Sequence, residues 1–87
     1  MIVRMWEAKV VSGRLEDAVG WLVEAVVPDA LAAEGCLGAE AFRALGGEER
    51  VVLITRWADE YAEDWEEGRP PERLWEREHA WFFQPAT

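Results

Sequence analysis

The sequence predicts an α+β domain of the ferredoxin-like type, with the element order βαββαβ and a four-stranded antiparallel sheet. In residues 50–57 (RVVLITRW), five consecutive aliphatic or β-branched residues predict a strand that is covered on both faces. Residues 2–11 are also apolar on both sides, and residues 15–27 carry apolar groups at helical spacing. Because this fold places its first and third strands in the middle of the sheet, both strand-like segments suit those central positions.

Length and composition indicate one small domain, residues 1–87, with an excess of tryptophan. Half of the chain is apolar (51%), although a domain of this size buries only somewhat more than about 60% of its unfolded surface. Because each indole carries an N–H that needs a partner, we expect some tryptophans to line a pocket or a subunit interface. The six are Trp6, Trp21, Trp57, Trp65, Trp75 and Trp81.

The chain is strongly acidic, with a formal net charge of −9. Such a charge repels phosphate groups, so neither nucleic acid nor an anionic membrane surface is expected as a partner. A single cysteine, Cys36, excludes an internal disulfide and is typical of a reducing compartment. No segment resembles a signal peptide or a membrane span, so a cytoplasmic protein is expected.

Residues 2–11 form the first predicted strand, which a turn at residues 12–13 ends. The helix that follows contains Pro28, which lacks an N–H and clashes with the preceding turn. We therefore expect a kink or a restart there, with a short second piece over residues 29–34 that Gly35 ends. The predicted apolar stripe of the helix consists of Leu15, Ala18, Val19, Leu22, Val23, Val26 and Val27.

Residues 36–45 (CLGAEAFRAL) form a weaker, alanine-rich strand, as expected for the edge of a sheet. Gly46 and Gly47 supply the positive φ that short hairpin connections require. The sequence therefore predicts a hairpin between this strand and residues 50–57.

Residues 59–67 predict a second, short helix that carries six acidic residues. Tyr61, Ala62 and Trp65 form its narrow apolar stripe. One further turn is expected over residues 72–77 and a last strand over residues 79–84. The two predicted helices cover one side of the sheet, whereas the other side stays apolar. We expect a second copy of the chain to cover it, which gives a homodimeric α+β barrel.

Three features in order resemble the antibiotic biosynthesis monooxygenase-like proteins, which are small dimeric α+β barrels. They are MIVRMWEAKV with the turn Ser12-Gly13-Arg14, the Pro28 helix followed by EGCLGAEAFRAL, and VVLITRWADE before the second predicted helix. The resemblance implies oxygenation of polycyclic aromatic phenols or anthrones without a metal or organic cofactor. The family also includes haem-degrading relatives and members without an assigned activity.

The haem-degrading branch of this family has an asparagine on the first strand, a tryptophan on the second helix and a downstream histidine. Trp65 and His79 can stand in the latter two places, but the first-strand place is Glu7. A carboxylate there would repel the propionates of haem, so no haem is expected.

Glu7 is the candidate general base, because a desolvated carboxylate in a central strand has a raised pKa suited to deprotonating a phenol or an enol. The alternative is an ion pair with Arg56 or Lys9. Arg56, like Arg4, is a central-strand cation that can stabilise an oxyanion or bind a ligand carboxylate. The alternative is that each pairs with a neighbouring acid or extends to an end of the sheet. His79 is the only histidine, and it either transfers a proton or serves as a structural hydrogen-bonding group.

Trp57, Trp65 and Trp81 are the candidate walls of an aromatic pocket, with core packing in a small dimer as the equal alternative. One histidine and one cysteine cannot build a metal site, so no metal and no other cofactor is expected. The leading hypothesis is a cofactor-independent monooxygenase acting on small aromatic compounds of the anthrone or quinol type. A non-catalytic ligand-binding or scaffolding dimer, and an isomerase or cyclase on the same barrel, are the alternatives.

Overall fold

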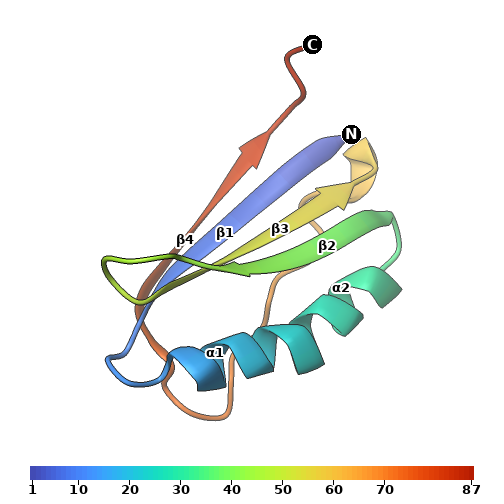
Figure 1. Cartoon of the computed structure of the whole chain (residues 1–87). Helices are drawn as coiled ribbons and strands as arrows, with labels where there is room; N and C mark the ends of the chain where they lie inside the picture. Colours follow the sequence, from blue (N-terminus) through green and yellow to red (C-terminus); the bar gives the residue numbers. More distant parts are fainter.

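The computed structural model covers residues 1–87 and contains a four-stranded antiparallel sheet with one long helix on one side (Figure 1). The strands are β1 (Ile2–Val10), β2 (Cys36–Arg43), β3 (Arg50–Trp57) and β4 (Trp75–Phe83), in the order β2-β3-β1-β4. This order confirms the ferredoxin-like α+β fold, with β1 and β3 in the centre and β2 at one edge. No helix combines the length and the apolar character needed to cross a bilayer.

The strand alternation gives the sheet two different faces. Trp6 of β1 lies opposite Leu53 of β3 and Ala80 of β4, and its neighbour Glu7 lies opposite Val52 and His79. Side chains of directly opposite residues share a face. The helix-side face carries Arg4, Trp6, Ala8, Val10, Val51, Leu53, Thr55 and Trp57, all of them buried. The open face carries Val3, Met5, Glu7, Lys9, Arg50, Val52, Ile54 and Arg56, together with His79, Trp81 and Phe83 of β4.

The predicted hairpin joins β2 to β3, and both of its glycines have positive φ, 74° at Gly46 and 64° at Gly47. In the register of this pair Phe42 lies opposite Val52, so its ring belongs to the open face. The hairpin prediction is therefore confirmed, although β2 ends at Arg43, two residues earlier than expected.

The helix runs without interruption as α1 (Leu15–Trp21), a π-helical turn (Leu22–Val26) and α2 (Val27–Ala32), and it packs on β2 and β3. A kink or a restart was expected at Pro28, with a second piece over residues 29–34. The structure has a second piece, α2, with Pro28 in its first turn, but it follows the preceding turn without a break and ends at Ala32. The π turn stands directly before α2, and Val27 donates its N–H to the carbonyl of Leu22, five residues back. This wider turn keeps residues spaced by four on one side, because an α-helix has 3.6 residues per turn. The fully buried positions are Ala18, Leu22, Val26 and Ala30, whereas Val23 of the expected stripe is 54% exposed.

The second predicted helix is absent. Only Asp59–Tyr61 form a single 3-10 turn, and the expected turn over residues 72–77 is missing because β4 already begins at Trp75. Six acids in nine residues place like charges four apart, as at Glu60 and Asp64, and such pairs destabilise a helix. The expected helix therefore lacks the cations that would offset this repulsion.

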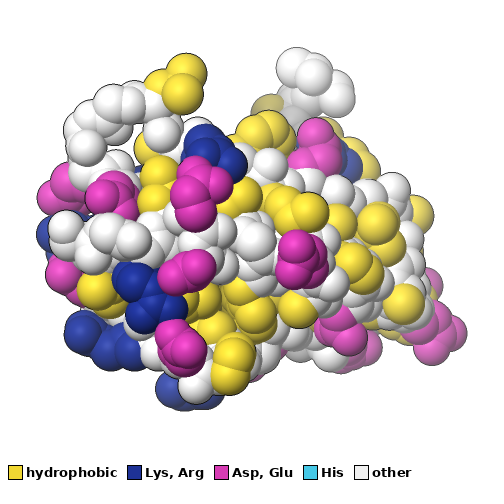
Figure 2. Space-filling model, turned by 60° about the horizontal axis from the view of Figure 1, so that its bottom comes forward, with side chains coloured by type: hydrophobic (Ala, Val, Ile, Leu, Met, Phe, Trp, Pro, Cys, Tyr) yellow, Lys and Arg dark blue, Asp and Glu magenta, His cyan; other side chains and the backbone are white.

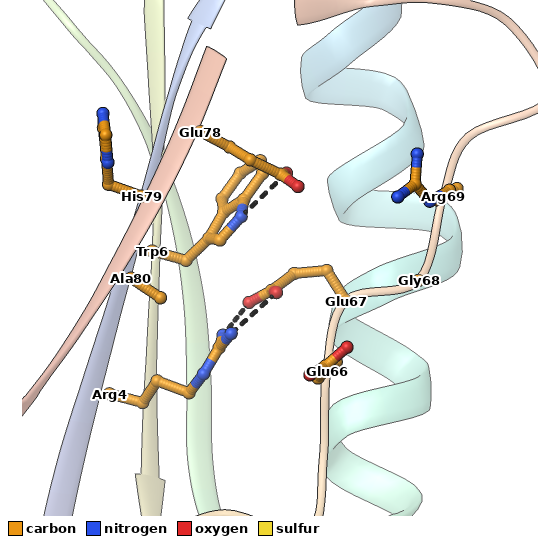
Figure 3. Close-up of a pocket in the computed structure, with 9 residues that line it drawn as sticks. All are labelled: Arg4, Trp6, Glu66, Glu67, Gly68, Arg69, Glu78, His79 and Ala80. Atoms are coloured by element: carbon orange, nitrogen blue, oxygen red, sulfur yellow. Dashed lines mark hydrogen bonds and ion pairs between the residues drawn. The ribbon is translucent and has the colours of Figure 1, made fainter.

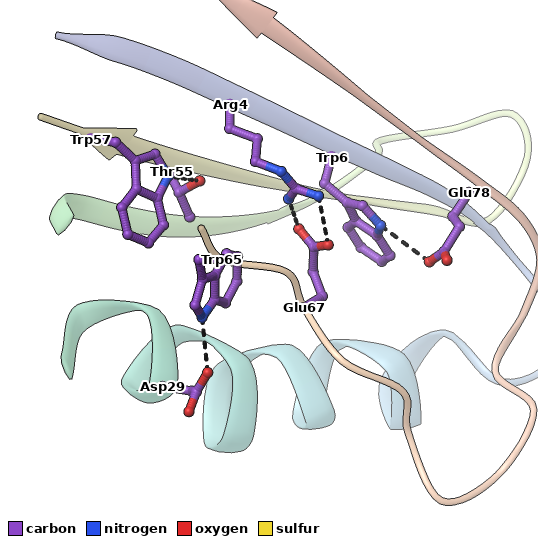
Figure 4. A network of polar contacts seen from close by, with 8 residues as sticks. All are labelled: Arg4, Trp6, Asp29, Thr55, Trp57, Trp65, Glu67 and Glu78. Atoms are coloured by element: carbon purple, nitrogen blue, oxygen red, sulfur yellow. Dashed lines mark hydrogen bonds and ion pairs between the residues drawn. The ribbon is translucent and has the colours of Figure 1, made fainter. Parts of the chain in front are cut away.

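Residues 58–74, called the connecting segment below, run along the helix-side face where a second helix would lie (Figures 1 and 4). Its ends are fixed by the buried side chains of Ala62 and Leu74. From Trp65 to Arg73 no backbone group takes part in a backbone hydrogen bond. Side chains therefore hold the middle of the connecting segment in place.

The surface around the helix is acidic and apolar groups are interspersed on it. Figure 2 shows magenta acidic side chains spread over this side, between yellow hydrophobic ones, with most of the visible Lys and Arg at the left. This distribution agrees with the net charge of −9, and basic side chains occur only locally on this acidic surface.

Candidate functional site

The centre of the candidate site is Arg4, whose side chain lies between the sheet and the connecting segment (Figure 3). It forms a two-pronged ion pair with Glu67, in which Nη1 donates to Oε2 and Nη2 donates to Oε1 at 3.0 Å. Only 8% of the Arg4 side chain and 6% of the Glu67 side chain are exposed. This is the geometry in which a guanidinium best recognises a carboxylate.

Aromatic rings surround the guanidinium group of Arg4. Its Cζ atom lies 5.8 Å from the ring centroid of Trp65 and 5.9 Å from that of Phe82, within the range of cation–π attraction. Trp65 in turn lies against Trp57, with ring centroids 5.6 Å apart and an interplanar angle of 32°. A buried cation, a carboxylate and flat apolar surfaces thus occur together.

Three indole N–H groups on this side of the sheet are paired (Figure 4). Trp6 donates to Glu78 at 3.1 Å, Trp57 donates to Thr55 at 2.8 Å, and Trp65 donates to Asp29 of α2 at 2.9 Å. No buried side-chain nitrogen or oxygen lacks a hydrogen-bond partner. These bonds orient the rings around Arg4, as expected for buried tryptophans.

Two clefts open beside Arg4. One of about 340 Å³ is lined by Arg4, Trp6, Glu67, Arg69, Glu78 and Ala80, among others (Figure 3). A second, also of about 340 Å³, is lined by Arg4, Glu63, Trp65, Glu66, Ala80 and Phe82. We call the two together the Arg4 cleft. The volume of each part falls in the range of pockets that bind small molecules.

The six site residues predicted from the sequence do not form a single pocket. Trp57 and Trp65 belong to the cluster around Arg4. The remaining four, Glu7, Arg56, His79 and Trp81, belong to the open face, on the other side of the sheet. His79 is nevertheless among the residues that line the first cleft, although its imidazole points away from Glu67 (Figure 3).

On the open face Glu7 is paired with a cation, but the cation is Arg50 and not Arg56 or Lys9. The Glu7 Oε2 and Arg50 Nη1 atoms are 3.4 Å apart, and 21% of the Glu7 side chain is exposed. Arg56 instead pairs with Glu40 of β2. His79 lies opposite Glu7 and its ring centroid is 5.8 Å from that of Trp81.

A charged network borders Glu7 at the hairpin end of the open face. The Glu48 carboxylate accepts a hydrogen bond from Arg50 at 2.8 Å and lies 3.5 Å from the ammonium of Lys9. The hydrogen bond from Arg50, followed by the charge of Lys9, lowers the pKa of Glu48 below its usual value. This end of the open face is therefore polar, whereas the end near Phe83 is apolar.

Sequence reasoning did not identify Glu67 and Glu78 and gave Arg4 only a general role. A signal for Arg4 existed, because it shares a strand side with Trp6, Ala8 and Val10. An arginine in such a row needs a buried partner. That partner lies 63 residues away, in a segment without regular structure. The sequence pattern of such a segment does not indicate which side chains point toward the sheet. No group of three or more His, Cys, Asp or Glu residues is arranged to hold a metal ion.

The molecule is thus a ferredoxin-like α+β domain with an arginine-centred aromatic cleft on the helix side of its sheet. The family model described as antibiotic biosynthesis monooxygenase matches residues 1–70, four-fifths of the chain. The chain belongs to this family. The matched part includes Arg4, Trp65 and Glu67, whereas β4 with Glu78, His79 and Trp81 lies beyond it. Searches of curated proteins and of solved structures found no match.

Proposed function

We propose that this chain binds a small aromatic molecule in the Arg4 cleft and oxygenates it without a metal or organic cofactor. The observation that carries the proposal is the position of Arg4. It is the only charged residue among the 14 buried ones, and aromatic rings flank it. Membership of the monooxygenase family supports oxygen chemistry as the use of such a cleft.

The proposed reaction takes an anthrone-type methylene compound and dioxygen to the corresponding quinone and water. A base removes a proton, and the resulting enolate or phenolate carbon is the electron donor to dioxygen. After the carbon–oxygen bond forms, the hydroperoxide loses water, so one oxygen atom stays in the product. The positive charges of Arg4 and Arg69 at the cleft would favour the oxyanion over the neutral substrate, and the aromatic walls would hold the ring oriented and shielded from water.

Glu78 is the proposed base. Its carboxylate lines the Arg4 cleft and is oriented by the hydrogen bond from Trp6 at 3.1 Å. Glu67 is engaged with Arg4, and Glu7, the base expected from the sequence, lies on the opposite face of the sheet. A carboxylate at the position of Glu78 can take a proton from a ligand bound beside Arg4.

Replacing Glu78 by glutamine is expected to lower the rate of oxygen uptake by about 100-fold or more, the usual contribution of a general base. An oxygen electrode and a panel of anthrones and quinols measure this rate. The matched control is Glu24→Gln on the exposed side of the helix, which removes the same charge and should keep the rate.

Each other outcome of this experiment has a definite meaning. A loss in Glu7→Gln but not in Glu78→Gln would move the chemistry to the open face and contradict our choice of base. Conversion of substrate without oxygen uptake would identify an isomerase or cyclase. Binding without any turnover of the panel would identify a non-catalytic ligand-binding protein.

We also propose that a second copy of the chain covers the open face. Phe42, Trp81 and Phe83 are between 43% and 49% exposed there, and they adjoin the apolar groups of β1 and β3. A patch of this kind on one side of a small sheet is typical of a subunit interface. Because a twofold axis brings the same patch from both copies together, a homodimer buries it completely.

Replacing Trp81 by glutamate is expected to weaken such a dimer by roughly 30-fold, equivalent to about 2 kcal/mol for a central aromatic anchor. Sedimentation equilibrium at micromolar concentration measures the change. The matched control is Leu45→Glu, since Leu45 is 95% exposed but lies in the hairpin loop. A wild-type chain that sediments as a monomer at this concentration would refute the dimer.

A further inference from the structure

The Glu67 carboxylate occupies the place beside Arg4 where an anionic group of a ligand would bind. We propose that the ligand of the Arg4 cleft is an aromatic carboxylate, and that it binds by displacing Glu67 from Arg4. This inference depends on the proposed function only in placing the ligand beside Arg4. It adds the chemical class of that ligand and an internal competitor for its site.

A ligand carboxylate can replace the carboxylate of Glu67 at Arg4. Arg4 is 8% exposed at its side chain, and both of its terminal nitrogens are engaged by Glu67. If a neutral ligand displaced Glu67, a buried guanidinium would be left without a countercharge, which is strongly unfavourable. A ligand carboxylate makes the same two bonds with the same planar geometry.

Aromatic surfaces lie next to the place of that carboxylate. Trp65 and Phe82 lie within 5.8 and 5.9 Å of the guanidinium, and the ring of Trp6 lines the same cleft. A flat ring bonded to a carboxylate can stack on such faces while its charge stays at Arg4. The cleft therefore selects for an aromatic body as well as for an anion.

The same cleft contains a second cation. Arg69 lines the cleft and forms no ion pair with any acidic group of the chain, in contrast to Arg4 (Figure 3). The position of Arg69 at the rim suits the approach of an anion past the surrounding carboxylates.

The segment that carries Glu67 can move away from Arg4. No backbone hydrogen bond holds the stretch from Trp65 to Arg73, and Gly68, next to Glu67, has a φ of 76°. This stretch is retained by the Arg4–Glu67 pair, by the bond from Trp65 to Asp29 and, near its far end, by the exposed ion pair of Glu72 with Arg14. None of these attachments is a bond of the sheet or of the helix, so the segment can open around Glu67 while both stay intact, once a ligand carboxylate takes the place of Glu67 at Arg4.

The test compares 2-naphthoate with its neutral analogue 2-naphthamide in the intact chain, with binding followed by quenching of tryptophan fluorescence. We expect 2-naphthoate to bind the wild type more tightly than 2-naphthamide. Glu67→Gln should increase the affinity for 2-naphthoate by about tenfold or more, because it weakens the internal competitor. The affinity for 2-naphthamide should stay unchanged.

Glu24→Gln is the matched control, since it removes one charge from an exposed position on the helix, outside the Arg4 cleft, where the carboxylate forms no ion pair. It should raise the affinity for 2-naphthoate by less than about threefold, as screened surface charges do. An equal increase in both variants would overturn the proposal, because it would show only a general effect of charge. Failure of both ligands to bind either the wild type or Glu67→Gln would overturn it as well.

The double variant Arg4→Gln/Glu67→Gln replaces the ion pair by two amides of similar size, and it should lose the preference for 2-naphthoate. A preserved preference would place the anion elsewhere and refute the inference. The binding assay needs no oxygen. Tight 2-naphthoate binding without turnover of any compound would remove the oxygenase proposal alone, and turnover without an effect of Glu67→Gln would remove this inference alone.

Discussion

Replacing Leu22 by alanine is expected to lower the free energy of unfolding by about 3–5 kcal/mol, the range observed for leucine in tightly packed cores. Leu22 is 0% exposed and belongs to the core cluster formed with Trp6, Leu53 and Leu74. Removal of its side chain leaves a cavity between the helix and the sheet that neither rigid element can fill. Urea denaturation followed by tryptophan fluorescence measures the loss.

The matched control for this variant is Val23→Ala, one position further along the helix. Val23 is 54% exposed, so the expected loss is below about 0.5 kcal/mol. The contrast tests which side of the helix packs on the sheet, because the apolar stripe predicted from the sequence contained both residues. Similar losses in the two variants would contradict the π turn at Leu22–Val26.

Replacing Gly35 by alanine is expected to lower the free energy of unfolding by about 2–5 kcal/mol, for two reasons. Gly35 has a φ of 82°, where a residue with a Cβ atom loses roughly 1–2 kcal/mol. A Cβ atom at this position would also overlap the side chain of Tyr61, and such overpacking costs about 1–3 kcal/mol. The same denaturation experiment measures the sum.

Gly13→Ala separates the two contributions. Gly13 has almost the same φ, 83°, but a Cβ atom there would have nothing within 4 Å. Its expected loss is therefore about 1–2 kcal/mol, from the backbone alone. If Gly35→Ala were no more destabilising than Gly13→Ala, the close packing of Tyr61 on Gly35 would be disproved.

The contact between Gly35 and Tyr61 also fixes the start of the connecting segment. Ala58 donates its N–H to the carbonyl of Gly35 at 2.8 Å, and the Tyr61 hydroxyl donates to Glu34 at 3.1 Å. Those bonds join the end of the helix to the chain that leaves β3. We therefore expect Gly35→Ala to loosen the Arg4 cleft as well as to destabilise the fold.

The sheet could be predicted because its signals are local. Residues 2–11 and 50–57 are apolar on both sides, which only a central strand satisfies, and the glycines at 46 and 47 mark a hairpin. The second helix was predicted wrongly from the spacing of Tyr61, Ala62 and Trp65. That spacing was outweighed by repulsion among neighbouring acids, and the side chains of Trp65 and Glu67 bond to Asp29 and Arg4 instead.

The candidate site was predictable only in part. Of the three predicted pocket walls, Trp65 lines the Arg4 cleft, whereas Trp57 is 1% exposed and packs against Trp65, which is the alternative of core packing. Glu7 was chosen without knowledge of the strand register, and a shift of one residue exchanges the two faces of a sheet. The Arg4–Glu67 pair depends on a contact across 63 residues, which no local pattern indicates.

The absence of backbone hydrogen bonds from Trp65 to Arg73 has a consequence for protein engineering. Amino-acid changes, insertions or grafted loops in residues 69–73 of this stretch remove no ladder or helical bond and leave the buried Arg4–Glu67 pair in place, so the thermal stability of the scaffold should change little. New ligand selectivity could therefore be evolved in these residues, while the four strands and the helix stay unchanged.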